Sequence, residues 1–211
     1  MNTLIHEEKY RGEGLLKKIS ECDVTVCGAG AIGSNLVDNM ARQGFRKFTV
    51  VDMDRVDDHN RHTQLWSRRD VGLLKTTALK GAIFNSMGVT INDVSKKLDE
   101  SNVRKFLKKG TLVIDGFDNS ESRRIVTNYC RNNAIECLHV GLYKDCAEIT
   151  WNGIYRVPDN VKGMDICEYP LARNIILMAV SVASESVIRY LEKGVQESYT
   201  ITLGDFRISR L

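Results

Sequence analysis

The sequence lacks the features that mark fibrous, repetitive or membrane-anchored proteins. It has only two prolines, Pro158 and Pro170, and shows no internal repeat or low-complexity tract. No apolar run approaches the roughly 18 residues of a membrane span, and Met1–Ser20 lacks the basic start and apolar centre of a signal peptide. We therefore expect a cytoplasmic protein with no membrane partner.

The sequence also lacks a strong excess of either charge. Lysine and arginine total 30 against 27 acidic residues, which leaves a net charge of +3. This excess is too small to predict a nucleic-acid partner. A chain of 211 residues, 43% of them hydrophobic, can bury roughly 70% of the surface that it exposes when unfolded. We expect one domain over residues 1–211.

Paired cysteines are absent as well. The six cysteines form no C-x-x-C pair and no short cluster with histidine; they stand at positions 22, 27, 130, 137, 146 and 167. Structural zinc sites are typically built from such pairs, so we expect no zinc, and free thiols in a reducing compartment. Cys27, at the end of an apolar run, is predicted to be a buried packing residue.

The sequence does contain a regular alternation of apolar strands and helical stretches. Strands are predicted at 24–27, 48–51, 112–114 and 136–140, and helices at 32–43, 76–86 and 122–132. Helices that separate successive strands are typical of parallel sheets. We predict an α/β fold: a Rossmann-like, mostly parallel sheet with helices on both faces.

The C-terminal part has a different pattern. Residues 147–151 and 154–157 alternate like antiparallel strands around Asn152-Gly153, a common hairpin dipeptide. We therefore predict that antiparallel strands extend the sheet. The remaining predicted elements are a core helix at 174–192, ended by Gly194, and a closing hairpin of 199–203 with 206–208.

A glycine-rich turn follows the first predicted strand and opens the first predicted helix. Gly28, Gly30 and Gly33 have the G-x-G-x-x-G spacing, which permits a tight bend and close approach of phosphates to free backbone amides. Asp52 and Asp54 follow the second strand, where such folds bind a ribose hydroxyl. These residues predict a nucleotide site. NAD, FAD and ATP stay open as ligands, and a purely structural turn is the weaker interpretation.

Three further stretches carry a family resemblance. Residues 52–64 resemble the D-x-D-x-V-x-x-x-N-x-x-R-Q pattern of the ubiquitin-activating-enzyme-like adenylyltransferases, the ThiF/MoeB/HesA family. Residues 70–75 resemble the family's D-V-G-x-x-K, and residues 114–119 its D-x-x-D-N. With a late helix at 173–194, the similarity extends from about Cys22 to the C-terminal end. By this resemblance the chain is identified as a short member without the zinc site.

The resemblance implies an enzyme that uses ATP and Mg²⁺ to adenylate a C-terminal carboxylate. The substrate is often the Gly-Gly end of a small ubiquitin-like or sulfur-carrier protein, and members commonly form homodimers. Asp52 would hold the ribose and Asp118 would bind Mg²⁺, while Asn60 and Lys75 would contact phosphates. The residue types suit these roles, because lysine is a compact cation and aspartate a hard oxygen ligand. The implied nucleotide-binding set also includes Asp54, Gln64 and Asn119.

One position departs from the family pattern. Thr63 stands where N-x-x-R-Q has its arginine, and threonine cannot supply the forked, permanently charged donor of a guanidinium. Arg61, two positions earlier, is the candidate to reach the same phosphate, and it joins Lys75 and Asp118 as a predicted catalytic group. The resemblance also makes Arg11 a candidate for the arginine that a neighbouring subunit contributes.

The segment 158–173 resembles the crossover loop that carries a reactive cysteine in ThiF-like members. Cys167 would then be a catalytic residue that captures the adenylate as a thioester or joins an acyl disulfide, because nearby cations such as Lys162 or Arg173 favour the nucleophilic thiolate. The alternative is an ordinary loop cysteine, and the sequence favours neither.

The leading hypothesis is an adenylyltransferase that acts on a carrier protein or a peptide C terminus. Three alternatives stay open: a relative that activates a carboxylate on a small molecule or on tRNA, a non-catalytic nucleotide-binding partner subunit, and an NAD-dependent oxidoreductase. The last is the weakest, because Asn60, Lys75 and Asp118 suit triphosphate chemistry and have no role in hydride transfer.

Overall fold

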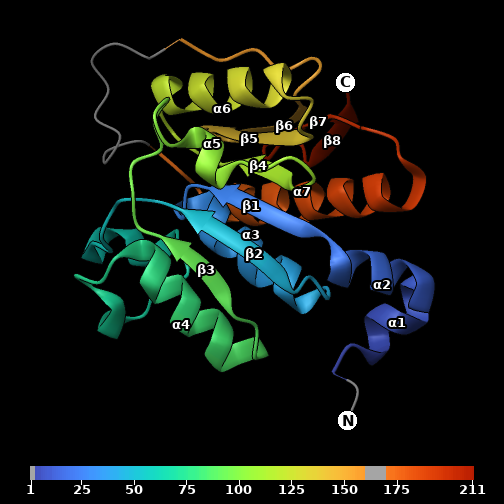
Figure 1. Cartoon of the computed structure of the whole chain (residues 1–211), viewed down its shortest axis with the longest axis horizontal. Coiled ribbons are helices and arrows are strands. Elements are labelled where there is room, and N and C mark those ends of the chain that lie inside the picture. Colours follow the sequence, from blue (N-terminus) through green and yellow to red (C-terminus); the bar gives the residue numbers. More distant parts are fainter. Residues whose placement is uncertain (1–2, 160–169) are drawn as a thin grey trace.

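The computed structural model describes residues 3–159 and 170–211. Eight strands form one sheet in the order β3-β2-β1-β4-β5-β6-β7-β8 (Figure 1). The first five in this order are parallel: β3 (Ile91–Val94), β2 (Lys47–Val51), β1 (Asp23–Cys27), β4 (Leu112–Asp115) and β5 (Cys137–Tyr143). The last three are antiparallel: β6 (Cys146–Trp151), β7 (Tyr199–Thr202) and β8 (Arg207–Arg210). The predicted mostly parallel sheet with an antiparallel C-terminal extension is confirmed.

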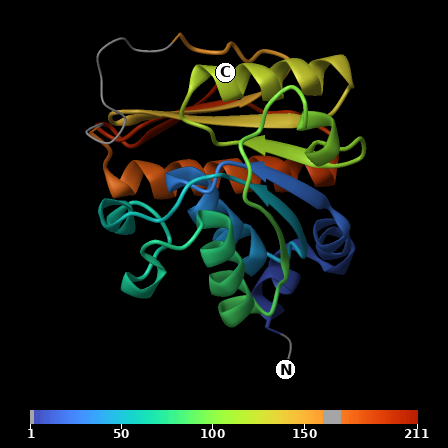
Figure 2. The same cartoon turned by 60° about the vertical axis from the view of Figure 1, so that its left-hand side comes forward.

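Helices cover both faces of this sheet, as predicted (Figures 1 and 2). One face is covered by α3 (Ala31–Arg42), α4 (Lys75–Met87) and α7 (Arg173–Lys193), and the other by α5 (Val103–Phe106) and α6 (Ser120–Asn132). Two short 3₁₀ turns, η1 (Asp58–His62) and η2 (Arg68–Asp70), lie between β2 and α4. The sequence analysis does not predict the first two helices, α1 (Ile5–Arg11) and α2 (Glu13–Glu21), the strand β3 or the short helix α5. Helix α2 packs against α7.

Apolar side chains of the central strands alternate between two cores, because neighbouring residues of a strand point to opposite faces. In β4, Leu112 and Ile114 join the larger core with α3 and α7, whereas Val113 joins the smaller core with α5 and α6. Both faces are buried, which explains the continuous apolar runs. Cys27 lies fully buried in the smaller core, as predicted, and burial raises the pKa of its thiol well above the usual value.

The hairpin predicted around Asn152-Gly153 is wrong, and residues 154–157 form no strand. Both edges of β6 are already paired, with β5 on one side and β7 on the other. The hairpin instead joins β5 to β6, where Lys144 has a positive φ of 56° in the turn before Cys146. Asn152 is buried, and its side-chain oxygen lies 3.0 Å from Nε2 of His139. This dipeptide therefore serves an internal hydrogen bond and not a hairpin.

The long helix α7 ends at Gly194, whose φ of 70° is typical of a helix C-terminus. Among the described helices it alone has the length and apolar composition of a membrane span, and half of that stretch is buried inside the protein. Its buried side chains pack with those of α3, β5 and β6 in the larger core. The predicted closing hairpin follows as β7 and β8.

Candidate nucleotide-binding site

The parallel strands end at a common edge of the sheet, and the chain leaves β1 and β4 there toward opposite faces. β1 leads into α3, and the neighbouring β4 leads into α6. Open α/β sheets bind ligands at such a switch point, because the diverging loops leave a crevice. The loops after β1, β2 and β4 contain residues 28–30, 52–54 and 116–119. The structure thus brings the predicted glycines and aspartates to one edge.

The three motif glycines have different structural roles. Gly28 has a φ of +94°, and a Cβ there would lie 3.2 Å from the carbonyl group of Gly116. A Cβ on Gly33 would come within 1.9 Å of the Gly28 carbonyl oxygen, whereas a Cβ on Gly30 would meet nothing within 4 Å. Gly28 and Gly33 therefore permit close packing of the backbone. Gly30, which precedes the first turn of α3, faces the open side of the loop, where a phosphate can approach.

Asp52 ties the glycine loop to the end of β2. Its Oδ2 accepts a hydrogen bond from the backbone N–H of Ala29 at 2.6 Å, and its Oδ1 accepts one from Asp54 at 2.7 Å. Burial raises the pKa of Asp52 above its usual value, although Lys75 and the two backbone donors oppose that change. Each oxygen retains acceptor capacity, so the predicted ribose contact is compatible with this geometry.

Lys75 brings a cation to the same loop from the start of α4. Its Nζ lies 2.9 Å from Oδ2 of Asp54, and its side chain is only 10% exposed. The backbone N–H of Lys75 also donates to the Asp54 carbonyl oxygen at 2.9 Å. This arrangement holds an ammonium group beside the glycine loop, where it can serve as a point charge for a phosphate.

Asp118 and Asn119 lie in the loop between β4 and α6. Asn119 caps α6 by accepting a hydrogen bond from the backbone N–H of Ser122 at 2.9 Å. Asp118 is exposed, and its Oδ1 lies 3.4 Å from Nδ2 of Asn119. The loop contacts the glycine turn, because Gly116 N–H donates to the Cys27 carbonyl oxygen at 2.9 Å. Capping therefore leaves the Asp118 carboxylate available for a ligand.

The predicted phosphate-binding residues after β2 already contact other protein groups. Asn60 Oδ1 accepts a hydrogen bond from the residue that caps η1, at 3.1 Å, and no contact in the described part of the chain uses its amide nitrogen. Arg61 Nη1 lies 2.5 Å from Oδ1 of Asp58. Gln64 Oε1 accepts from Nε1 of Trp66 at 2.6 Å. The Asn60 amide is therefore ready for a ligand, whereas the charge of Arg61 is compensated.

A buried polar cluster that the sequence analysis did not assign supports the loop after β4. Asp115, the last residue of β4, is fully buried, and its Oδ2 lies 2.9 Å from His139 Nδ1 and 3.9 Å from Arg123 Nη1. Arg123 also donates to Val140 O at 2.8 Å and to Tyr155 Oη at 3.0 Å. Burial alone raises the pKa of Asp115, but Arg123 and His139 bring it below the usual value. Asp115 is therefore ionised at neutral pH.

This cluster connects the interior to the Asp118 loop. Oδ1 of Asp115 accepts a hydrogen bond from the backbone N–H of Phe117 at 3.1 Å. An ionised carboxylate only accepts, so Nδ1 of His139 carries the proton, and the His139 ring stacks on Tyr155 with 3.7 Å between ring centres. Asp115 lies inside a motif that the sequence displays, but His139 and Tyr155 are distant in sequence. No local pattern could have identified them.

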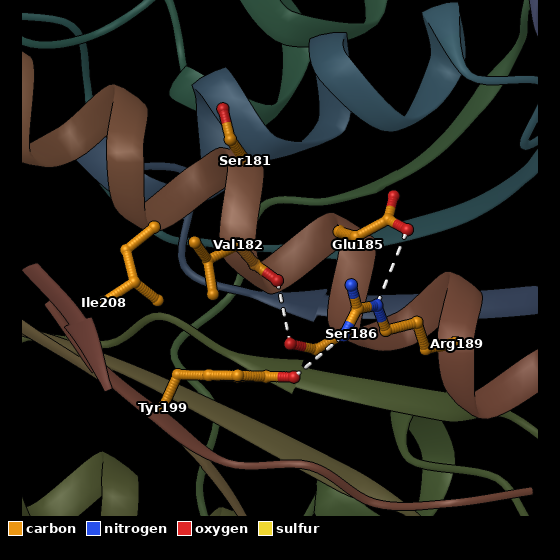
Figure 3. Close-up of a pocket in the computed structure, with 7 residues that line it drawn as sticks. All are labelled: Ser181, Val182, Glu185, Ser186, Arg189, Tyr199 and Ile208. Carbon is orange, nitrogen blue, oxygen red and sulfur yellow. Dashed lines mark hydrogen bonds and ion pairs between the residues drawn. The ribbon is translucent and has the colours of Figure 1, made fainter. Parts of the chain in front are cut away.

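A cavity of about 300 Å³ lies away from the glycine loop, between α7 and the last two strands (Figure 3). Its lining residues are Ser181, Val182, Glu185, Ser186, Arg189, Tyr199 and Ile208. Arg189 lies 3.7 Å from Glu185 and 3.2 Å from Glu197. Because this arginine is compensated by two carboxylates, the cavity is not suited to a triphosphate.

Comparison with known proteins identifies the family of this chain. A profile of the ThiF family matches residues 4–161. The chain belongs to the ThiF family. SUMO-activating enzyme subunit 2 of Dictyostelium discoideum is 28% identical over 134 residues, which are 62% of this chain and 20% of that protein. The tRNA threonylcarbamoyladenosine dehydratase of Haemophilus influenzae is 27% identical over 145 residues, 64% of this chain and 56% of that protein.

The fold of this ThiF-family chain matches solved structures over its whole length. The crystal structure of E. coli MccB with ATP superposes with a TM-score of 0.80 at 16% identity, covering 100% of this chain and 71% of that one. The match confirms the predicted Rossmann-type architecture. The chain spans only about a fifth to about a half of the two curated relatives.

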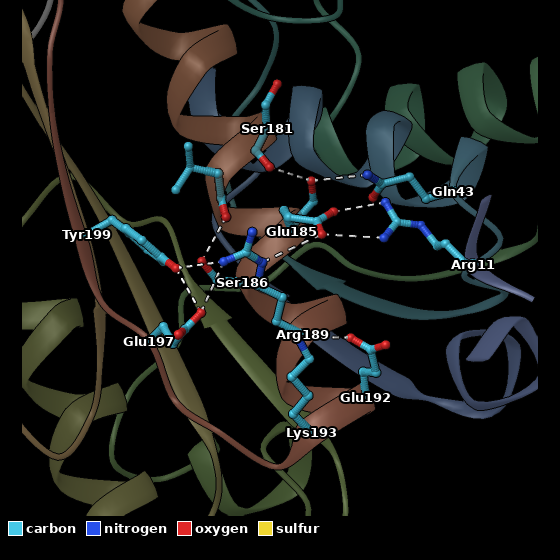
Figure 4. A network of polar contacts seen from close by, with 12 residues as sticks. Arg11, Gln43, Ser181, Glu185, Ser186, Arg189, Glu192, Lys193, Glu197 and Tyr199 are labelled. Carbon is cyan, nitrogen blue, oxygen red and sulfur yellow. Dashed lines mark hydrogen bonds and ion pairs between the residues drawn. The ribbon is translucent and has the colours of Figure 1, made fainter. Parts of the chain in front are cut away.

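Arg11, the candidate for a contribution to a neighbouring subunit, is turned toward its own chain (Figure 4). Its Nη2 lies 2.8 Å from Glu185 Oε2 on α7, and its Nε lies 2.5 Å from Glu7 Oε2. The Arg11 side chain is 9% exposed. It links α1 to α7 here, and a role in another subunit would require both ion pairs to break.

The ThiF-like cysteine candidate, Cys167, lies outside the described residues. The described ends of the segment 158–173 both contact segments that adjoin candidate-site residues. Ser120, two residues after Asp118, donates through Oγ to the Pro158 carbonyl oxygen at 2.6 Å. At the other end, Arg173 Nη1 donates to the His62 carbonyl oxygen at 3.2 Å. The role of Cys167 stays a prediction.

The glycine geometry predicts opposite outcomes for two alanine substitutions. Gly33→Ala should lower the free energy of unfolding by at least about 1–3 kcal/mol, because its Cβ would overlap the Gly28 oxygen. Gly30→Ala should fold with little change in stability but weaken ATP binding by about tenfold or more, because its methyl group would displace the ligand from one hydrogen bond. Thermal unfolding and ATP titration of both variants distinguish the two roles; a loss of stability in Gly30→Ala without loss of binding contradicts them.

Proposed function

We propose that this ThiF-family chain is an ATP- and Mg²⁺-dependent adenylyltransferase that activates the C-terminal carboxylate of a small ubiquitin-like or sulfur-carrier protein or of a peptide. The supporting observation is the arrangement at the switch point, where an open glycine loop, a nearly buried lysine and an exposed aspartate converge. The name of the SUMO-activating relative favours a ubiquitin-like substrate. We further propose that the protein forms a homodimer and is cytoplasmic.

The residues present fit a role for Mg²⁺. No group of three or more potential metal ligands occurs in residues 3–159 and 170–211. Mg²⁺ does not require one, because it retains water ligands and binds one or two carboxylates together with phosphate oxygens. Asp118 supplies an exposed carboxylate for this purpose. Bound Mg²⁺ would neutralise negative charge on the phosphates.

The protein's contribution to the reaction is positioning and charge stabilisation. A carboxylate attacks the α-phosphate and pyrophosphate leaves, so the protein must align a weak nucleophile and stabilise charge on the leaving group. The amides of the glycine loop, Lys75 and the Asn60 amide are among the groups of this chain that can do so. A thiolate at Cys167 attacking the acyl adenylate would release AMP and leave a thioester.

The function is tested by ATP–pyrophosphate exchange with purified protein and Mg²⁺, with and without a pool of small carrier proteins that end in Gly-Gly. We expect exchange that depends on the carrier. Cys167→Ser serves as the control, because its exchange should be unchanged if the thiol acts only after adenylation. Measurable ATP binding without exchange would instead indicate a nucleotide-binding subunit and contradict the adenylyltransferase proposal.

A second candidate substrate is a carboxylate attached to tRNA. It is favoured by the match to the tRNA threonylcarbamoyladenosine dehydratase, which covers 64% of this chain. The same ATP site would serve both reactions. Exchange stimulated by total tRNA and not by the carrier pool would identify this alternative.

A further inference from the structure

We propose that Arg173, the first residue of α7, binds the phosphates of the nucleotide. The inference rests on the proposed ATP site, and it assigns to that site a residue from the C-terminal half of the chain. Three observations carry it: where α7 begins, what its first side chain contacts, and which nearby cations already have a carboxylate partner.

α7 begins at the edge of the sheet that carries the glycine loop. In Figures 1 and 2 the orange start of α7 lies at the end of the molecule toward which the parallel strands β1 and β2 point. α7 also packs along α3, the helix that the glycine loop opens. The first side chain of α7 is therefore within the surroundings of the candidate site.

The Arg173 side chain contacts a segment that is itself bound to the start of α3. Its Nη1 donates to the carbonyl oxygen of His62, the last residue of η1, at 3.2 Å. The next carbonyl oxygen, that of Thr63, accepts from Asn35 Nδ2 at 3.0 Å. Two residues later, the N–H of Leu65 donates to Ser34 Oγ at 3.2 Å.

Ser34 and Asn35 lie near the beginning of α3, four and five residues after Gly30. The guanidinium of Arg173 is thus connected, through residues 62–65, to the beginning of α3, the helix that follows the open Gly30 turn. A ligand phosphate at that turn lies on the same edge as the guanidinium.

Among residues 3–159 and 170–211, no carboxylate pairs with the charge of Arg173. Lys75 lies 2.9 Å from Asp54, and Arg61 lies 2.5 Å from Asp58. The one contact of the Arg173 side chain among the described residues is with a neutral carbonyl oxygen, and the residue is exposed. A guanidinium has five N–H donors, so a planar fork remains for phosphate oxygens.

A purely structural role for Arg173 is also chemically clear: it would cap the last carbonyl group of η1. The two roles predict different measurements. If Arg173 is only a cap, its replacement should lower the stability of the fold and weaken the binding of all ligands of the site equally. If Arg173 binds phosphates, its replacement should weaken the binding of ligands that carry phosphates and leave the binding of adenosine unchanged.

The test compares ATP and adenosine binding by calorimetric titration in wild type, Arg173→Gln and Arg173→Lys. We expect Arg173→Gln to weaken ATP binding by about 10-fold to about 100-fold, the effect of one charged hydrogen-bonding group, and to leave adenosine binding unchanged. Arg173→Lys should recover part of the loss, because it restores charge without the fork. Arg207→Gln, on the last strand, is the matched control and should bind ATP as wild type does.

A second variant keeps the test decisive. Thr63→Arg places a guanidinium one residue from the carbonyl group that Arg173 contacts, so adding it to Arg173→Gln should restore ATP binding. The inference is overturned by equal weakening of ATP and adenosine, by unchanged ATP binding, or by an effect confined to the carboxylate substrate. Failure of wild-type protein to bind ATP would contradict the proposed site itself, which is a separate outcome.

Discussion

Replacement of Asp118 by asparagine is expected to lower kcat for adenylation by about 100-fold to about 1,000-fold, the cost typical of removing one group that stabilises charge in a transition state. Asparagine keeps the shape of the side chain but removes the negative charge that a divalent cation requires. The measurement is the rate of ATP–pyrophosphate exchange at saturating Mg²⁺ and carrier. The reason is local, since Asp118 is exposed in the loop between β4 and α6, next to the glycine loop.

The fold should be unaffected by this change. The described contact of the Asp118 side chain is a 3.4 Å approach to Asn119, so thermal unfolding of Asp118→Asn should match wild type. Glu121→Gln is the matched control: it removes an exposed carboxylate three residues farther on, in the first turn of α6, where the partner is Lys97 at 3.6 Å. Wild-type exchange in Asp118→Asn, or an equal loss in Glu121→Gln, would remove Asp118 from the site.

Replacement of Asp115 by asparagine is expected to lower the free energy of unfolding by about 3–5 kcal/mol at pH 7, the cost of breaking a buried ion pair from one side. The substitution leaves Arg123 buried without its counter-charge and weakens the hydrogen bond from His139 Nδ1. Urea unfolding of the two proteins measures the difference. Asp93→Asn is the control, because its partner Lys80 lies near the surface and such pairs contribute about 1 kcal/mol or less.

The stability difference between wild type and Asp115→Asn should depend on pH in a defined direction. The pKa of Asp115 is lower in the folded protein than its usual value of 3.8. The stability contributed by its ionised form is therefore fully present above the unfolded pKa and is lost as pH falls through the folded pKa. The difference should be constant near neutrality and shrink below about pH 4. A difference that grows on acidification would contradict the assignment of an ionised Asp115.

Much of the fold was predictable because its signals are local. Apolar runs of strand length, separated by helical stretches, predicted the parallel strands β1, β2, β4 and β5 and the helices α3, α4 and α6, but not β3 or α5. The hairpin at Asn152-Gly153 failed for a nonlocal reason: β7, nearly 50 residues later, occupies the edge of β6 that the hairpin required. The short helices α1 and α2 were also not predicted, although Leu15, Leu16 and Ile19 of α2 have helical spacing and α2 packs against α7.

In the candidate site, too, some residues could be predicted from local sequence signals and others could not. Gly28, Gly30, Lys75 and Asp118 stand at characteristic spacings, so the sequence could place them at the ends of strands and at helix starts. The partners that tune them are set by folding: Asp54 pairs with Lys75, and Asp58 pairs with Arg61. Asp115, Arg123 and His139 come from β4, α6 and β5, and Tyr155 follows β6. No spacing pattern in the sequence indicates that these four residues form a cluster.

The sequence alone determined most strands and helices of the parallel sheet, the phosphate-binding turn and the family, because these depend on side-chain periodicity and on residues that lie close together along the chain. Only the tertiary structure decided which charges are compensated and which are free. Compensation depends on distances between residues far apart in sequence, such as Arg11 and Glu185, and on burial, which strengthens electrostatic interactions between the groups that it brings together.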